Sequence, residues 1–171
     1  MPASSFSRHV LPESVLRFIR GCQARVPCHL GGGAALSGVF LGHRLSRDID
    51  LVCHQRVDLR GLSGLLSEVA AESGGTVRLV QDAGTFVRGE LRLVDAAIDV
   101  DLLFEGAEDL QPATNVEGVQ VESLTDLRAA KLTCLLSRSE PRDLVDLLFL
   151  DRAGYLPEQD LPLAVRKDAG I

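Results

Sequence analysis

Two carboxylates that are separated by one residue, Asp48 and Asp50, are the side chains of this sequence best placed to do chemistry. In a β-strand, residues i and i+2 point to the same side, while Ile49 and Leu51 supply an apolar face that can be buried. Two like charges this close repel each other and need a cation nearby. Carboxylate oxygens are hard ligands of the kind that Mg²⁺ or Mn²⁺ prefers. The pair therefore predicts a divalent metal site.

A run of glycines precedes this pair and ends with Gly32 and Gly33. Because glycine has no Cβ atom, the backbone can approach an anion closely, and the N–H groups that open a helix at Ala34 would point toward it. We therefore expect Gly32 and Gly33 to bind phosphate. A phosphate site and a carboxylate pair that are joined by one short helix favour a metal–nucleotide site. An ordinary strand–turn–helix with solvated acids is the alternative, but it leaves the string HRLSRDID unexplained.

The order and spacing of these residues carry a family resemblance. Gly32-Gly33, then fourteen residues, then Asp48-Ile49-Asp50 resembles the first motif of the DNA polymerase β-type nucleotidyltransferase superfamily. The strings GGAAL and HRLSRDIDL are similar, more specifically, to the AbiEii/AbiGii-like nucleotidyltransferases, which are toxins of toxin–antitoxin and abortive-infection systems. The resemblance covers roughly residues 29–150. Many members have a longer helical C-terminal region than this chain, which leaves recognition of the acceptor open.

The resemblance implies a third metal-binding carboxylate, as two-metal transfer commonly uses. The superfamily pattern is an Asp that is preceded by one apolar residue and followed by an apolar run, and Asp101 in VDLLF matches it. Asp99, on the same face of the expected strand, is the second choice. A solvated acid on an edge strand is the alternative for either residue.

A later string, LTDLRAAKLTCLLSRSEPRDLVDLLFL, resembles the helical motif of the same family. By this resemblance Lys131 would reach the triphosphate as a catalytic point charge. Asp143 and Asp146, one helical turn apart, would help to form the nucleotide pocket, with Arg138 and Arg142 nearby. Without the family, the two acids are equally well explained as a solvated helix face.

Polar residues also occupy the turn before the carboxylate pair. Arg44 and Ser46 belong to the family string and are expected at the nucleotide site. Arg44 could pair with a phosphate or a carboxylate, and Ser46 could brace the turn through a local hydrogen bond. His43 is also expected to brace the turn.

These residues must be positioned by a regular framework. The hydrophobic periodicity predicts helices over residues 11–24, 34–41, 59–70, 127–136 and 140–150, with Thr125 as an N-cap. It predicts strands over 26–30, 48–53, 76–81, 97–104 and 119–121, and one strand or a hairpin broken around Gly89 over 85–94. Residues 1–10 read as a loosely packed start, 105–118 as a loop, and 161–167 as no more than a final turn.

This order of elements predicts an α+β (α/β) fold, in which helices flank a mixed β-sheet. We expect a nucleotidyltransferase core with an N-terminal helix over residues 1–121. A C-terminal helical segment, residues 122–171, would complete the nucleotide pocket.

Composition restricts the alternatives. The net charge of −6 argues against a broad nucleic-acid footprint, although not against a local basic patch. No apolar run is long enough to span a membrane, and the N-terminus lacks the apolar centre of a signal peptide, so a cytoplasmic protein is expected. The scattered cysteines read as reduced, mostly buried thiols. The pairs Cys28-His29 and Cys53-His54 read as small core residues beside strand ends rather than as a zinc site.

The sequence thus predicts a nucleotidyltransferase that uses Mg²⁺ (or Mn²⁺) to move a nucleoside monophosphate from a nucleoside triphosphate to an acceptor hydroxyl. The toxin resemblance implies a tRNA end or a protein hydroxyl as the acceptor and a cognate antitoxin as a partner. One alternative is a small-molecule nucleotidyltransferase that modifies an aminoglycoside or a lincosamide. The other is a catalytically silent nucleotide-binding or interaction module.

Overall fold

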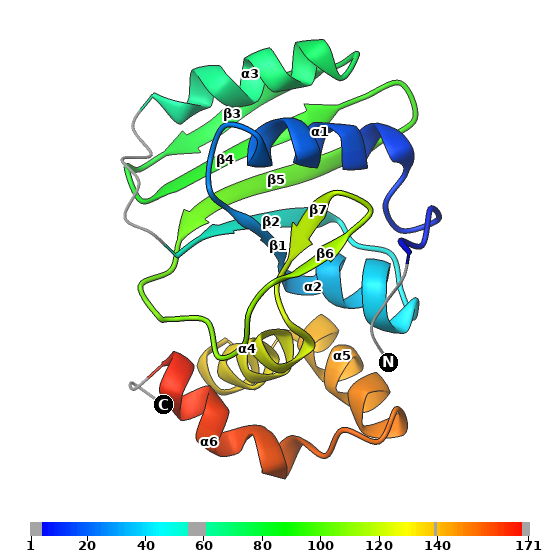
Figure 1. Cartoon of the computed structure of the whole chain (residues 1–171), viewed down its shortest axis with the longest axis vertical. Helices are drawn as coiled ribbons and strands as arrows, with labels where there is room; N and C mark the ends of the chain where they lie inside the picture. Colours follow the sequence, from blue (N-terminus) through cyan, green and yellow to red (C-terminus); the bar gives the residue numbers. More distant parts are fainter. Residues whose placement is uncertain (1–4, 55–60, 139, 169–171) are drawn as a thin grey trace.

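The computed structural model describes residues 5–54, 61–138 and 140–168. It confirms the α+β class, with a mixed sheet flanked by helices (Figure 1). In chain order the elements are α1 (Glu13–Gln23), β1 (His29–Gly31), α2 (Gly32–Ala35), the π-helix η1 (Leu36–Leu41), β2 (Asp48–Cys53), α3 (Leu62–Glu72), β3 (Thr76–Asp82), β4 (Phe86–Arg92), β5 (Ala97–Phe104), β6 (Thr114–Val116), β7 (Val119–Val121), α4 (Leu124–Ser137), α5 (Pro141–Arg152) and α6 (Pro157–Lys167).

The described strands form one sheet in the order β3-β4-β5-β2-β1-β7-β6. Strand β2 runs parallel to β5 and antiparallel to β1. Strand β1 is also parallel to β7, so the glycines that end β1 lie at the middle of the sheet. Helices α4, α5 and α6 gather at one end of the molecule, below the sheet in Figure 1.

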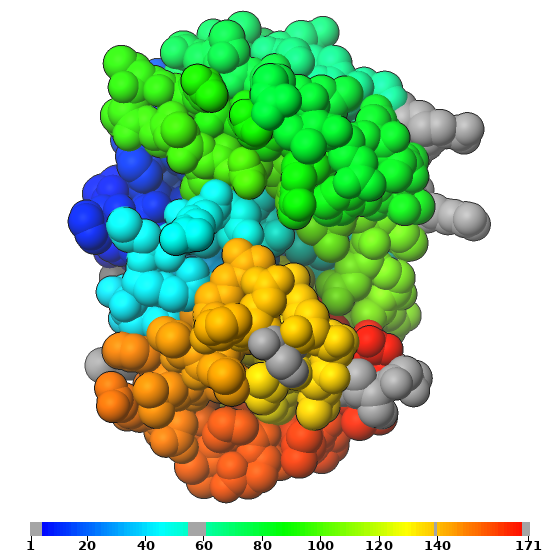
Figure 2. Space-filling model, turned by 180° about the vertical axis from the view of Figure 1, so that it is seen from behind, coloured from blue at the N-terminus to red at the C-terminus, as the bar shows by residue number. Residues whose placement is uncertain are grey.

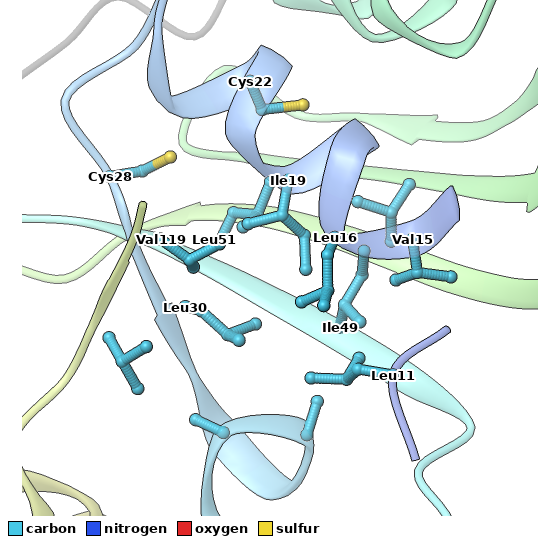
Figure 3. Packing of buried hydrophobic residues seen from close by; sticks show 14 of the residues in the cluster. Leu11, Val15, Leu16, Ile19, Cys22, Cys28, Leu30, Ile49, Leu51 and Val119 are labelled. Atoms are coloured by element: carbon cyan, nitrogen blue, oxygen red, sulfur yellow. The ribbon is translucent and has the colours of Figure 1, made fainter. Parts of the chain in front are cut away.

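The main core lies between α1 and the central strands. Val15, Leu16 and Ile19 follow helical spacing on one face of α1, and all three are fully buried. They pack toward Ile49 and Leu51 of β2 (Figure 3). This face of β2 is therefore apolar and covered, as the alternation in the sequence predicted. Because side chains alternate along a strand, the residues between them face the opposite side of the sheet.

The helix that joins the glycines to the carboxylate pair differs from the expected one. It begins two residues earlier, at Gly32, and changes from an α-helix to a π-helix at Leu36. The predicted stop at Gly42 is confirmed: its φ is +62°, and its N–H donates to the carbonyl of Ser37. π-turns are rare and frequently occur near functional sites.

The start of the described chain is more firmly packed than expected. Phe6 and Val10 are both buried in the core, and the N–H of Ser7 donates to the carbonyl of Gly38. The prediction of a loosely packed start is therefore wrong for residues 5–10, and residues 1–4 lie outside the described part. Two apolar side chains in a polar stretch gave too weak a pattern to reveal this packing.

Three other elements also differ from the prediction. The loop expected at 105–118 contains β6, and the final turn expected at 161–167 is the end of a full helix, α6, that begins at Pro157. The N-cap of α4 is Ser123, which accepts a hydrogen bond from the N–H of Asp126, and not Thr125. A serine two residues earlier fits the same capping rule, so the sequence alone did not separate the two.

The strand expected over 26–30 is shorter and lies later, as β1 at His29–Gly31, whereas the remaining elements follow the prediction. Residues 86–92 form a single strand rather than a broken hairpin. Helix α3 begins at Leu62, and the expected start at Leu59 lies outside the described residues. The four cysteines are free thiols, and three of them are buried. In the part of the chain that the structure describes, no helix combines the length and apolar character that a membrane crossing requires.

Candidate active site

The two carboxylates of β2 lie on the sheet face that turns away from α1. The parallel pairing of β2 with β5 places Asp48 beside Asp99 and Asp50 beside Asp101. Acids that are about fifty residues apart in the sequence thus become neighbours in one layer. The family resemblance implied a third acid near this pair, with Asp101 as the first choice and Asp99 as the second.

A cavity of about 230 Å³ lies where this face meets the C-terminal helices. Gly32 and Gly33 line it together with Asp48, Asp50 and Asp101. Its cationic lining consists of Arg44, Arg88, Lys131, Arg138 and Arg142. Seen from behind, the surface of β2 is recessed between the strands β4 and β5 and the junction of α4 with α5 (Figure 2). The lining also contains Glu105 and Glu122, so five cations face five acids, and this mixture of charges suits a polyphosphate that binds together with a divalent cation.

The surroundings of the two candidate third acids differ. Asp101 is only 5% exposed and lines the cavity. Asp99 is exposed and borders a separate, shallower depression with Glu90 and Arg92. The geometry therefore favours Asp101 over Asp99 as the partner of Asp50.

Arginines compensate two of the three acids. Arg142 from the start of α5 donates to Asp48 over 2.7 Å. Arg88 from β4 donates to both carboxylate oxygens of Asp101. Both guanidinium groups are partly exposed, so they can move from a carboxylate to a phosphate without a large desolvation cost.

Asp50 is the acid that remains uncompensated. Among the described residues, no cation forms an ion pair with it. Burial, together with the charges of Asp48 and Asp101, raises the pKa of Asp50 to about 6. A divalent cation at this point would supply the missing positive charge, and the donor set is carboxylate oxygen throughout. In the type of their donor atoms the residues therefore suit Mg²⁺ or Mn²⁺, which Asp48, Asp50 and Asp101 would hold.

Position 32 requires glycine for two reasons, its backbone conformation and its close approach to Asp50. Its φ is +60°, and a Cβ atom built there would lie 1.7 Å from Oδ2 of Asp50. The backbone thus approaches the carboxylate more closely than any other residue type would permit. At Gly33, a Cβ atom would lie 2.3 Å from the guanidinium of Arg44. Both glycines therefore leave space for a charged group of the cavity.

Asp146 of α5 is the centre of a buried ion network. Its carboxylate accepts hydrogen bonds from Arg44 over 2.6 and 2.8 Å and from His43 over 2.7 Å, and it pairs with Lys131 over 2.8 Å. Burial acts to raise the pKa of this carboxyl, but its hydrogen bonds with Arg44, His43 and Lys131 outweigh that effect and hold it well below the usual range. Asp146 therefore stays ionised although its side chain is fully buried.

Asp143, one helical turn before Asp146 in α5, also pairs with Lys131. It accepts from Lys131 over 3.0 Å and from Arg138 over 3.3 Å. Neither Asp143 nor Asp146 lines the cavity, whereas Lys131, Arg44 and Arg138 do. The two acids expected at the nucleotide pocket thus lie behind its cations and hold them in place.

Residues of the turn between η1 and β2 also contact acidic side chains. Ser46 donates to Asp48 over 3.3 Å, and the buried ring of His43 stacks on Phe149 while it contacts Asp146. Sequence reasoning missed Arg88, which reaches the site only because β4 pairs with β5 and places it opposite Asp101. It also missed Glu122, a buried acid that follows β7 and lines the cavity. Neither residue belongs to a local motif.

The sequence of residues 21–171 matches the family described as the nucleotidyl transferase AbiEii toxin of type IV toxin–antitoxin systems. A search among curated proteins found no match. Among solved structures, a candidate nucleotidyltransferase from H. pylori is 22% identical with a TM-score of 0.63, covering 94% of this chain and 81% of that one. JHP933 from Helicobacter pylori is 23% identical with a TM-score of 0.62, covering 96% and 84%. MenT4, a nucleotidyltransferase toxin from Mycobacterium tuberculosis H37Rv, is 16% identical with a TM-score of 0.53, covering 79% and 57%. At these identities the structural likenesses show a shared fold.

Proposed function

Since this chain belongs to the AbiEii nucleotidyl transferase toxin family, we propose that it transfers a nucleoside monophosphate from a nucleoside triphosphate to an acceptor hydroxyl. The observation that carries the proposal is the meeting of Asp48 and Asp50 with Asp101 beside Gly32, in a cavity lined by cations. Family membership makes the chain a nucleotidyltransferase and excludes the catalytically silent module. The substrate, the metal and the acceptor are the parts that we propose.

The triphosphate would lie between the glycines and the cations. The backbone of Gly32 and Gly33 offers an approach without side chains, and the helical segment that begins there directs N–H groups toward an anion. Lys131, which Asp143 and Asp146 hold in place, would neutralise phosphate oxygens. Arg142 would move from Asp48 to the phosphate oxygens and so act beside Lys131. Residues 122–171 thus complete the nucleotide pocket in this proposal.

Asp48, Asp50 and Asp101 would hold Mg²⁺, which when bound neutralises the triphosphate and lowers the pKa of the acceptor hydroxyl. Asp101 is placed to take up the hydroxyl proton once Arg88 has moved to the phosphates. The acceptor oxygen then forms a bond to the α-phosphorus, and the bond from the α-phosphorus to the bridging oxygen breaks in line with it. Pyrophosphate leaves with the bonding electrons.

We propose the end of a tRNA or a protein hydroxyl as the acceptor, and a cognate antitoxin that counteracts the enzyme. The toxin character of the family supports both. The cavity itself does not distinguish these acceptors from a small molecule, so the experiment must include all three.

The test incubates the protein with each of the four nucleoside triphosphates, labelled at the α-phosphate, in the presence of Mg²⁺. Separate reactions receive total tRNA, a protein extract or a mixture of aminoglycosides and lincosamides. We expect label in tRNA or protein, and a fall of at least about 100-fold in the Asp50→Asn variant. Glu68→Gln, at an exposed position of α3, is the matched control. Transfer that persists in Asp50→Asn, or no transfer with any nucleotide, would refute the proposal.

Expression in bacteria separates the toxin from a drug-modifying enzyme. We expect growth arrest with the native protein and none with Asp50→Ala. Drug resistance without growth arrest would instead identify a small-molecule acceptor.

A further inference from the structure

A second group of metal-ligating side chains lies outside the proposed nucleotide site. His29 opens β1, His54 directly follows β2, and Asp109 belongs to the segment between β5 and β6. One ligand atom from each of the three lies within 4.8 Å of the other two. The antiparallel pairing of β1 with β2, in which His29 is opposite Val52, brings the two histidines together. Their ring centroids are 5.5 Å apart.

The orientation of His54 is set by a backbone group. Its Nδ1 lies 3.0 Å from the carbonyl oxygen of Ala107, so this nitrogen carries the proton and donates it. The other nitrogen, Nε2, then faces Oδ1 of Asp109 at 3.1 Å and Oε1 of Glu122 at 3.3 Å. A ring that donates one N–H to a carbonyl and directs the other nitrogen toward carboxylates has the usual orientation of a metal-binding histidine.

A salt bridge alone does not account for the surroundings of His29. Its Nδ1 is buried and has no hydrogen-bond partner among the described residues. It lies 3.8 Å from Oδ2 of Asp109, which is too long for a hydrogen bond. A buried polar nitrogen without a partner costs free energy, and such an atom calls for an explanation such as a missing ion.

From this geometry we propose that His29 Nδ1, His54 Nε2 and the carboxylate of Asp109 bind one Zn²⁺ ion. With Zn–N and Zn–O bonds of about 2.0–2.2 Å and tetrahedral angles, neighbouring ligand atoms are about 3.3–3.5 Å apart. His29 Nδ1 lies 3.8 Å from Oδ2 of Asp109 and His54 Nε2 lies 3.1 Å from Oδ1, so the two nitrogens approach different oxygens of this carboxylate, each at a separation near this value. Two imidazoles and one carboxylate form a donor set that suits zinc.

The fourth position of the ion would face an adjacent cavity. This cavity of about 290 Å³ is lined by the three proposed ligands and by Gln23, Pro27, Cys28 and Gln120. Water would reach the ion there. Glu122 and Glu105, which line the nucleotide cavity, approach His54 from the other side at 3.3 and 3.9 Å.

Two other arrangements around His54 fit less well. His54 also lies near Glu105 and Glu122, but Nζ of Lys167 lies 3.6 Å from Glu105 and disfavours a second cation there. The cysteines next to the histidines, Cys28 and Cys53, are buried in the apolar core, and Figure 3 shows Cys28 among its side chains. Among the described residues, no cysteine belongs to a group of ligand atoms close enough to share one ion with these histidines.

The proposed ion would join three separate segments of the chain. It would fix the stretch between β5 and β6 to the ends of β1 and β2, next to Glu122 at the rim of the nucleotide cavity. The inference is independent of the proposed transfer reaction. It requires nitrogen ligands, whereas the proposed magnesium site offers oxygen alone.

The test measures zinc binding by the full-length protein. Equilibrium dialysis against Zn²⁺ in the presence of excess Mg²⁺ should give one zinc ion per chain in the native protein and in Asp50→Asn. The same measurement should give a loss of at least about 10-fold in affinity in His29→Ala and in Asp109→Asn. His9→Ala, at an exposed position, is the matched control and should bind like the native protein.

A second measurement reports the ligand type in the native protein, so it does not depend on how the His29 and Asp109 variants fold. Co²⁺ that replaces Zn²⁺ in a tetrahedral site with nitrogen ligands gives intense visible absorption, and octahedral oxygen sites do not. We expect this absorption in the native protein and in Asp50→Asn. Its absence from the native protein, or zinc binding that is lost in Asp50→Asn but kept in His29→Ala, would overturn the proposal.

Discussion

At the scale of single residues, the site is a balance of charges in a poorly solvated place. Arg142 and Arg88 offset Asp48 and Asp101, whereas Asp50 forms no ion pair with any described residue, and the more distant charges of Lys131 and Arg142 offset it only in part. The pKa of Asp50 is therefore raised by burial and by like charges, and the folded metal-free protein binds a proton that the unfolded chain releases. Ionised Asp50 therefore lowers the stability of the metal-free fold, and its proposed role is to bind the metal ion.

The first prediction follows from the sign of this shift. Because the pKa of Asp50 is about 6 in the folded protein and 3.8 as a free group, the native protein should lose stability as the pH rises from about 4 to about 6. The Asp50→Asn variant has no carboxyl group at this position, so it should not show this loss of stability. In EDTA, the free energy of unfolding of Asp50→Asn relative to native should increase by on the order of 1 kcal/mol between pH 5 and pH 8.

Urea unfolding at the two pH values measures this difference. Addition of Mg²⁺ at pH 8 should stabilise the native protein more than the variant. A difference between variant and native that does not change with pH would contradict the assignment of the raised pKa to Asp50.

The second prediction concerns Asp146. Asp146→Asn should lower the free energy of unfolding by roughly 3–5 kcal/mol, since it leaves Arg44 without its carboxylate partner and leaves Lys131 paired with Asp143 alone. The pKa of Asp146 is lowered on folding, so its stabilisation is present above its ordinary value of 3.8 and is lost as the pH falls below it.

Urea unfolding at pH 7 checks this loss, with Asp151→Asn at an exposed position of α5 as the control. The control should lie within about 0.5 kcal/mol of the native protein. A loss below about 1 kcal/mol in Asp146→Asn would show that the buried network contributes little to stability.

At the scale of elements, the connection from β1 through α2 and η1 to β2 determines the site. Strand β1 ends in the middle of the sheet, and Gly32 turns the chain directly into a helix beside Asp50. The π-helix then ends at Gly42, and the turn returns the chain to β2 next to β1. The glycines and the carboxylates therefore meet because two adjacent strands are joined by one short helical segment.

The third prediction uses two glycines that differ in their surroundings. Gly32→Ala should destabilise the protein by at least about 1–2 kcal/mol, because φ is positive and the new Cβ atom meets Asp50. Gly64→Ala should instead stabilise it by roughly 0.5–1 kcal/mol, because this glycine lies inside α3 with open space around it.

Thermal unfolding of the two variants and the native protein measures both effects. Transfer activity should fall in Gly32→Ala and stay unchanged in Gly64→Ala. Equal changes in stability for both variants would exclude a special role of Gly32.

At the scale of the whole molecule, the cavity exists because two layers meet. The sheet supplies Asp48, Asp50 and Asp101, and the segment of α4, α5 and their connection supplies three of the five cations, Lys131, Arg138 and Arg142. Helix α6 supports α4 from the other side: Arg128 pairs with Asp160, and Lys167 pairs with Asp126 over 2.9 Å. The carboxylate of Asp126 also accepts from the N–H of Leu110, which ties the long β5–β6 connection to the same helix.

The fourth prediction tests this support. Asp160→Asn should lower the free energy of unfolding by roughly 2–4 kcal/mol, because Arg128 is largely buried and would lose its partner. Glu158→Gln, at an exposed position of the same helix, is the control. The binding of a nucleoside triphosphate, measured by calorimetry, should also weaken in Asp160→Asn. Unchanged stability would show that α6 does not hold α4.

The sequence by itself determined the local parts of this protein. Alternation and helical periodicity identified α1, β2 and β5 and the face on which the acids lie. The spacing of Gly32-Gly33 from Asp48 and Asp50 indicated the superfamily, and the strings GGAAL and HRLSRDIDL indicated the family. These features depend on residues near one another in the chain, so local rules of side-chain direction were sufficient. Helix α6, β6 and the packing of Phe6 were missed because their patterns are short or weak without the surfaces that they cover.

Only the tertiary structure decided which distant residues share a site. The register of β5 against β2 distinguished Asp101 from Asp99, and the register of β4 brought Arg88 to Asp101. The docking of α5 turned Asp143 and Asp146 from expected pocket residues into supports of Lys131 and Arg44. Strand order and helix docking depend on the free energy of the whole fold, and no short stretch of sequence contains that information.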